Sequence, residues 1–203
     1  MWKSQNRKQN LKIVCDFAGK IRAKPEGFRI GRVRERRKKE MYDKFGEMSS
    51  YKEINELAEN LANEGDIASL REMAKENGIP EDFVDLYLEG EIPKLCDALI
   101  AAVGKLEVEA ADLKLMGLMK DWVEYIKGLC MENEMIAHQV RKAGKSLKGC
   151  MAVLLKYSFE NRTSVPKEIV KEAKISASRV DFGVPGMAEA KKMIKDYYLG
   201  GVK

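Results

Sequence analysis

From residue 50 onward, apolar side chains recur every three or four positions, which is the spacing of a helix with one buried face. Ser50 and Glu53 have the spacing of a capping box, in which the two side chains bond free amides of the first turn. The apolar stripe that follows consists of Ile54, Leu57, Ala58 and Leu61. This pattern predicts a helix that begins directly after Ser50.

Glycine, asparagine and proline divide the rest of the chain into further helices. The first boundaries are expected at Gly65-Asp66, Asn77-Gly78, Pro80, Gly90 and Pro93. A long apolar helix is then expected from about Val108 to Cys130. The later helices are expected to be one capped by Asn133 and stopped by Gly144, one from Ser146 to Phe159, a short one after Ser164, and a last one after Pro185.

Strand patterns are nearly absent. Residues 28–34 alternate between polar and apolar types and could form an edge strand or part of a helix, and residues 180–184 are a weaker candidate. We therefore expect an all-α fold, with a compact multi-helix domain over residues 48–200. Residues 1–47 have few helix-face patterns and are expected to form a basic, irregular N-terminal arm. The arm is either a functional part of the protein or an extension that the folded domain does not need.

Charge is sorted along the chain more strongly than the formal net charge of +5 suggests. Residues 1–47 contain 15 basic and 6 acidic residues, residues 48–140 contain 8 and 20, and residues 141–203 contain 14 and 6. An acidic middle is thus flanked by two basic ends. Such segregation favours binding to charged partners over a particular reaction.

Two basic clusters are candidates for contacts with nucleic-acid phosphates. They consist of Arg32, Arg34, Arg36, Arg37, Lys38 and Lys39, and of Arg141, Lys142, Lys145 and Lys148. The second cluster surrounds an expected helix start, where free amides favour anions. The alternatives are that the first cluster is a solvated tail, and that the second pairs with the acidic middle of the same protein.

The acidic middle has two interpretations. It is either an ordinary solvated face, or a surface that occupies a basic groove built for nucleic acid. For the second case we name Glu107 and Glu109 as candidate protein contacts. Tyr198 is a third candidate, because Tyr197 and Tyr198 cannot both face inward on one helix.

Catalytic chemistry has little support in the sequence. His138 is the one histidine, and Cys15, Cys96, Cys130 and Cys150 are widely separated, so neither a zinc site nor a Cys-His pair is expected. Gly144-Lys145-Ser146 lacks the remaining glycine of a phosphate-binding loop. We expect no enzyme and no cofactor. No apolar run approaches the about 18–20 residues of a membrane helix, so a cytoplasmic protein is expected.

Segments 146–161, 165–170, 183–186 and 197–199 carry a resemblance. Over about residues 48–200 the chain is similar to small helical accessory proteins carried on mobile elements and phages of gut Clostridia. That setting includes conjugation accessories and the PcfK-like group of Cas9 inhibitors. The resemblance is one of general texture, and no functional residue is carried over from it.

Together these observations predict a non-enzymatic binding protein. The first hypothesis is a mobile-element or phage inhibitor that docks its acidic middle on a nucleic-acid-handling protein, such as a CRISPR effector. The alternative is a DNA-binding accessory protein that contacts phosphates through the two basic clusters.

Overall fold

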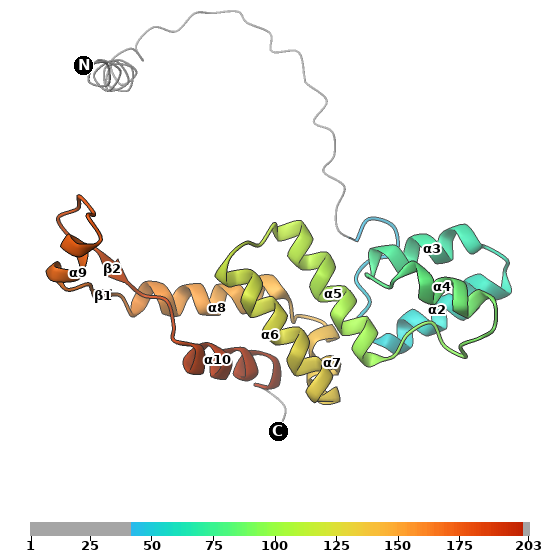
Figure 1. Ribbon diagram of the computed structural model, residues 1–203. Helices are drawn as coiled ribbons and strands as arrows, with labels where there is room; N and C mark the ends of the chain where they lie inside the picture. The colour runs from blue at the N-terminus through green and yellow to red at the C-terminus, as the bar shows by residue number, and fades with distance from the viewer. Residues whose placement is uncertain (1–41, 201–203) are drawn as a thin grey trace, which may run out of the picture. The chain divides into compact units, whose positions relative to one another are not determined.

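The computed structural model describes residues 42–200, and this part of the chain is all-α apart from one two-residue strand pair. The basic cluster at residues 32–39 and the strand candidate at residues 28–34 lie outside the described residues. The elements are α2 (Tyr51–Asn63), α3 (Ile67–Glu76), α4 (Glu81–Leu88), α5 (Ala98–Leu113), α6 (Leu118–Glu132), α7 (Glu134–Arg141), α8 (Leu147–Glu160), β1 (Thr163–Ser164), α9 (Lys167–Glu172), β2 (Asp181–Phe182) and α10 (Met187–Leu199) (Figure 1).

Side-chain caps set most of the helix starts. The Ser50 hydroxyl accepts a hydrogen bond from the Glu53 amide at 3.2 Å, and the Glu53 carboxylate accepts one from the Ser49 amide at 2.8 Å. The same kind of cap begins α8, where the Gly149 amide donates to Ser146 Oγ at 3.1 Å. These contacts are local, which is why the sequence predicted them.

The long helix expected from Val108 to Cys130 is wrong. The chain leaves the helical conformation after Leu113, because Lys114 and Gly117 both take positive φ values, of 51° and 54°. The apolar residues of this stretch therefore belong to two helices, α5 and α6, which pack against one another. The apolar pattern continues through this connection, and a non-glycine residue in the left-handed region is uncommon, so the sequence did not predict the break.

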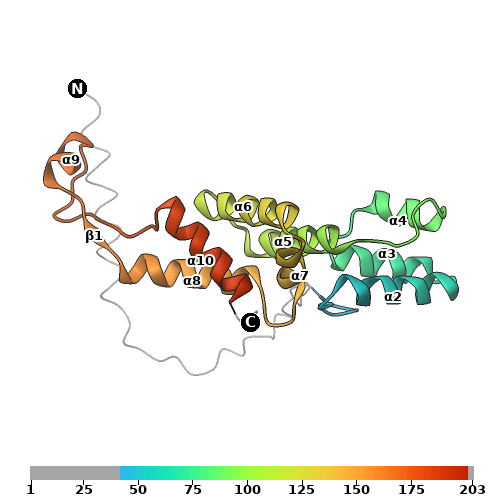
Figure 2. The ribbon, with the colours of Figure 1, turned by 90° about the horizontal axis from the view of Figure 1, so that it is seen from below.

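Two hydrophobic cores form within the described residues. The N-terminal core is built by α2, α3 and α4 with residues 95–96, and residues 45 and 48 also pack into it. The C-terminal core is built by α5, α6, α7, α8 and α10 (Figures 1 and 2). Helix α5 joins the two, because Ala101 lies in the N-terminal core while Ala102 and Leu106 lie in the C-terminal core.

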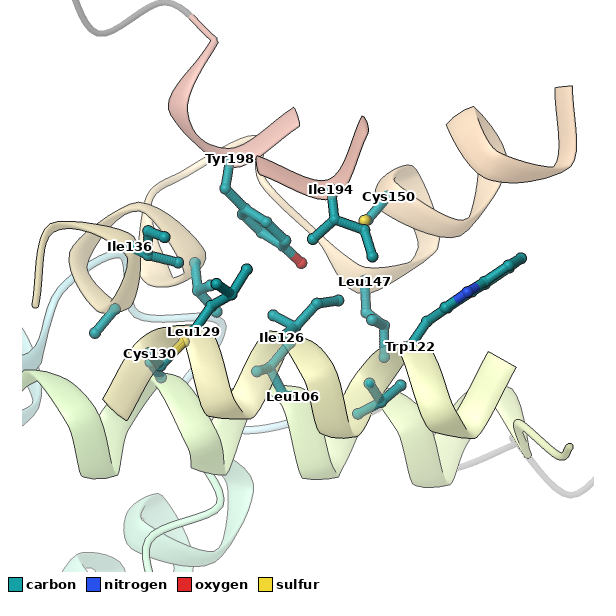
Figure 3. Packing of buried hydrophobic residues seen from close by; sticks show 14 of the residues in the cluster. Leu106, Trp122, Ile126, Leu129, Cys130, Ile136, Leu147, Cys150, Ile194 and Tyr198 are labelled. Atoms are coloured by element: carbon teal, nitrogen blue, oxygen red, sulfur yellow. The ribbon is translucent and has the colours of Figure 1, made fainter. Parts of the chain in front are cut away.

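The C-terminal core contains Tyr198 and two of the four cysteines, Cys130 and Cys150. Figure 3 shows Tyr198 and Ile194 of α10 pointing toward Leu129 and Ile126 of α6. Cys130 and Cys150 are free thiols buried in the same core. Burial raises the pKa of each to about 12, so both behave as small hydrophobic residues.

Residues 42–48 pack against the helices instead of leading away from them. The backbone amides of Lys44 and Phe45 each donate to the Glu76 carboxylate at 3.0 Å, and Met48 is buried. Contacts with the helical domain thus begin before residue 48, where the sequence placed its boundary.

Candidate functional site

The strongest charge concentration in the described residues lies in and around α2, α3 and α4. Residues 42–97 contain 15 acidic and 5 basic residues. Most of these carboxylates are exposed on the helix surfaces and on the connecting loops. We call the surface of residues 42–97 the acidic face.

Part of this charge is neutralised within the acidic face. Arg71 binds Glu81 at 3.2 Å and Asp85 at 2.6 Å, and Lys44 binds Glu72 at 2.9 Å. Other exposed carboxylates form no ion pair with another residue of the described range 42–200. They include Glu56, Glu59, Asp82, Glu89 and Glu91. The acidic face therefore keeps an excess of negative charge that can attract a basic partner.

A groove of about 510 Å³ runs along α2 within the acidic face. Glu56 and Glu59 line it together with Tyr51 and Tyr87, and Lys52 and Lys94 are also part of its lining. The pKa of Tyr87 is raised, first by burial and then by the nearby carboxylate of Glu59. Carboxylates beside aromatic rings suit the side chain of an arginine or a lysine, because the ring faces also attract cations.

Hydrogen bonds within the protein hold the backbone beside this groove in place. The Asn55 side chain donates to the Cys96 carbonyl at 2.8 Å and accepts from the Cys96 amide at 3.1 Å. These two bonds hold the segment before α5 against α2. The groove is therefore already formed without a partner, which reduces the ordering cost of binding.

Of the three candidate protein contacts, one is exposed and two are buried. Glu107 is exposed, and its carboxylate binds Lys127 Nζ at 3.2 Å. Glu109 is buried and is not a surface contact: its carboxylate accepts from the Leu147 amide and lies 3.7 Å from Lys105 Nζ. The pKa of Glu109 is raised by burial, against the opposing effects of the Leu147 amide and Lys105.

Tyr198 is likewise not a surface contact. Its side chain is 1% exposed, and burial raises the pKa of its hydroxyl. The ring of Tyr197 meets it edge to face at 4.9 Å, and the Tyr197 hydroxyl accepts from the Ser146 amide at 3.0 Å. Both tyrosines therefore fix α10 against the start of α8, and the choice of Tyr198 as a partner contact is wrong because its side chain is buried.

The four residues of the basic cluster at 141–148 also differ in their exposure to solvent. Arg141 is 2% exposed and cannot reach an external phosphate. Lys145 is half-buried, donates to the Tyr197 carbonyl and lies over the Tyr197 ring. Only Lys142 and Lys148 of this cluster are exposed. Within residues 42–200, none of the three lysines Lys142, Lys145 and Lys148 forms an ion pair with the acidic middle.

Arg141 and Lys105 instead belong to a buried polar network between the two cores. Arg141 donates to the Ala101 carbonyl at 3.2 Å and to the Asn77 side chain. Lys105, 1% exposed, donates to Glu47 and to the Lys145 carbonyl, the latter at 2.7 Å. No pattern in the sequence predicted this network as a whole. Its one local signal is the four-residue spacing of Lys105 and Glu109 within an apolar helix.

Catalytic and metal-binding groups are not gathered in the described range. No cluster of three His, Cys, Asp or Glu side chains there could hold a metal ion. His138 lies on α7, with Nε2 3.5 Å from the Glu134 carboxylate and its ring 5.4 Å from that of Tyr51. Among the helices of residues 42–200, none combines the length and the apolar character needed to span a bilayer.

Comparisons of this chain with protein-family models, with curated proteins and with solved structures found no match. The surface chemistry of the described residues is therefore the basis for assigning a function.

Proposed function

We propose that this chain is a non-enzymatic binding protein that docks its acidic face on the basic groove of a nucleic-acid-handling protein. The observation that carries the proposal is the set of unpaired carboxylates around the preformed groove on α2. A partner that binds nucleic acid offers a surface rich in arginine and lysine, which is complementary to this face. The resemblance of residues 48–200 to mobile-element accessory proteins favours a CRISPR effector as the partner.

Glu56 and Glu59 are the residues expected to contribute most. They lie one helical turn apart on α2, both line the groove, and neither forms an ion pair with another residue described by the structure. An arginine of the partner that enters the groove would meet both carboxylates and the ring of Tyr51 or Tyr87. Such an anchor has the composition of an interface hot spot.

The test compares two double charge reversals that change the net charge equally. Glu56→Lys/Glu59→Lys alters the groove, while Asp121→Lys/Glu132→Lys alters exposed carboxylates of α6. Each protein is titrated against a guide-loaded type II effector, and both its affinity and its competition with the target duplex are measured. The groove variant is expected to lose about tenfold or more in affinity, and the α6 variant to stay within about twofold. Equal losses in both variants would refute a specific role for the groove.

The DNA-binding alternative retains one supporting observation, the exposure of Lys142 and Lys148 near the start of α8. It requires affinity for free duplex DNA that falls steeply as salt rises and that weakens in Lys142→Ala/Lys148→Ala. Tight duplex binding with no effector complex would replace the docking proposal by this one.

A further inference from the structure

A second feature lies outside the acidic face, in the segment between α8 and α10. Strands β1 and β2 pair antiparallel, with Thr163 opposite Phe182, and α9 lies between them in the chain. The Val165 amide donates to the Val180 carbonyl at 2.8 Å and extends this pairing. Figure 1 shows the segment following the C-terminal end of α8. We call residues 159–182 the hairpin segment.

The hairpin segment borders an open hollow of about 540 Å³. This volume lies in the range of about 300–1,000 Å³ that is usual for ligand sites. Its apolar lining consists of Val165, Val170, Ile175, Ala177 and Val180. Ile175 and Ala177 are exposed, and Val165, Val170 and Val180 are half-buried, so part of this apolar surface stays open to a ligand.

The charged residues that line the hollow are all cations. Lys167, Lys171 and Arg179 line it, together with the hydroxyl residues Ser164 and Ser178, and no carboxylate does so. By contrast, the groove on α2 is lined by both Glu56 and Glu59. A ligand of the hairpin hollow should therefore combine an apolar body with negative charge.

These cations are available to a ligand. Lys167 and Lys171 are exposed and form no ion pair with another residue in the range 42–200. Arg179 is bound to Asp181 through Nε at 2.8 Å, which leaves its terminal amino groups free of that contact. Exposed cations without internal partners gain most from neutralising phosphates, because each contact releases a counterion.

Two exposed phenylalanines lie at the two ends of the hairpin segment, outside the lining of the hollow. Phe159 is 67% exposed and Phe182 is 64% exposed. The Arg162 guanidinium lies 4.3 Å from the centre of the Phe159 ring, and its Nε donates to the Phe159 carbonyl at 3.1 Å.

A Cβ at Gly183 would collide with the Ser158 carbonyl, so the close approach of β2 to the end of α8 depends on this glycine.

We propose that the hairpin segment binds single-stranded nucleic acid. Lys167, Lys171 and Arg179 would contact phosphates, a base would enter the apolar hollow, and another base of the same strand would stack on Phe159. Flat exposed rings beside cations favour unpaired bases over an acidic peptide, because every base offers a π face. A duplex is disfavoured because its base faces are hidden by stacking. The contact is independent of the proposed docking through the acidic face.

The experiment measures fluorescence anisotropy of labelled oligothymidylate and oligouridylate of about 12 nucleotides, over a series of salt concentrations. Lys167→Ala/Lys171→Ala is expected to reduce the magnitude of the logarithmic salt slope by about 1.4, at about 0.7 per phosphate contact on single strands. Lys192→Ala/Lys195→Ala, two exposed lysines of α10, is the control of equal charge and should leave the slope unchanged.

Phe159→Ala tests stacking separately from charge. It should weaken binding by about 5- to 150-fold while the salt slope stays the same, because no phosphate contact is removed. Circular dichroism checks that each variant keeps its helices. Binding of single-stranded DNA, of RNA or of both supports the proposal and shows which nucleic acid the segment binds. Absence of binding at low salt, equal affinity for a duplex, displacement by polyglutamate, or an unchanged slope in Lys167→Ala/Lys171→Ala would each overturn it.

Discussion

Gly104 and Gly128 provide a direct test of how the two cores are joined. Both lie inside helices, in α5 and α6, where alanine is favoured over glycine by about 0.5–1 kcal/mol. Helix propensity alone therefore predicts that alanine stabilises the protein at both positions. The surroundings of the two glycines in the folded protein are very different.

A methyl group at Gly104 has no space. Its Cβ would lie 2.5 Å from the Gly78 carbonyl oxygen and 2.8 Å from the Asn77 carbonyl oxygen. Both atoms belong to the backbone after α3, so no side-chain rotation can relieve the contact. Gly78 also has φ of +71°, which limits how that turn can move. At Gly128, by contrast, a Cβ would meet no atom within 4 Å apart from its chain neighbours and the backbone of its own helix.

The magnitudes follow from these contacts. Overpacking costs about 1–3 kcal/mol, and a rigid backbone neighbour places Gly104→Ala at the upper end, near 3 kcal/mol. After the propensity gain, the net loss of unfolding free energy is about 2 kcal/mol. For a chain of this size each kcal/mol shifts Tm by about 2–4 °C. Gly104→Ala should therefore lower Tm by about 4–8 °C, and Gly128→Ala should raise it by about 1–4 °C.

Thermal unfolding followed by circular dichroism measures both variants against the natural chain, and urea unfolding gives the free energies. A close backbone contact at Gly104 requires the two substitutions to change stability in opposite directions. If Gly104→Ala were as stable as the natural chain or more stable, the close packing of α5 on the turn after α3 would be refuted. Gly128→Ala is the matched control, because it repeats the same substitution in a helix without the backbone contact.

Two further predictions concern the buried polar network. Arg141→Ala should lower the unfolding free energy by about 3–5 kcal/mol, because it leaves the buried Asn77 side-chain oxygen without the Arg141 donor and removes the hydrogen bond to the Ala101 carbonyl. Urea unfolding measures this, and a loss below about 1 kcal/mol would contradict it. Glu109 has a pKa raised above its ordinary value of 4.5, so the folded state holds its proton to higher pH than the unfolded state does, and this contribution to stability is lost as pH rises through the folded-state pKa. The stability of Glu109→Gln relative to the natural chain should therefore improve as pH rises from about 4 to 7, as chemical unfolding at several pH values would show; a constant difference would contradict the raised pKa.

The helix starts were predictable because their causes are local. Ser50, Asn133 and Ser146 each cap a helix as expected, with a bond to an amide two or three residues ahead. The interruption between α5 and α6 was not predictable in the same way. It depends on Lys114 adopting a left-handed conformation, a choice that lysine's intrinsic preference opposes and that packing of α5 against α6 stabilises.

The candidate site was predicted in part. Charge counts along the sequence located the acidic middle, and the structure concentrates its unpaired carboxylates on residues 42–97. The choice of Glu107 and Glu109 within it was poorer, because two glutamates separated by two positions on a helix point in different directions. One binds Lys127 at the surface, and the other is buried beside Lys105.

The sequence by itself determined the helical class, most helix boundaries and the segregation of charge, since these follow from residues close together in the chain. Tertiary structure decided which charged side chains are buried in internal contacts and which stay exposed to a partner. Arg141 finds its partner Asn77 at a separation of 64 residues, and Lys105 finds Glu47 at 58. Burial of a cation is stable only where distant carbonyls and carboxylates converge on it, and folding alone brings those groups together.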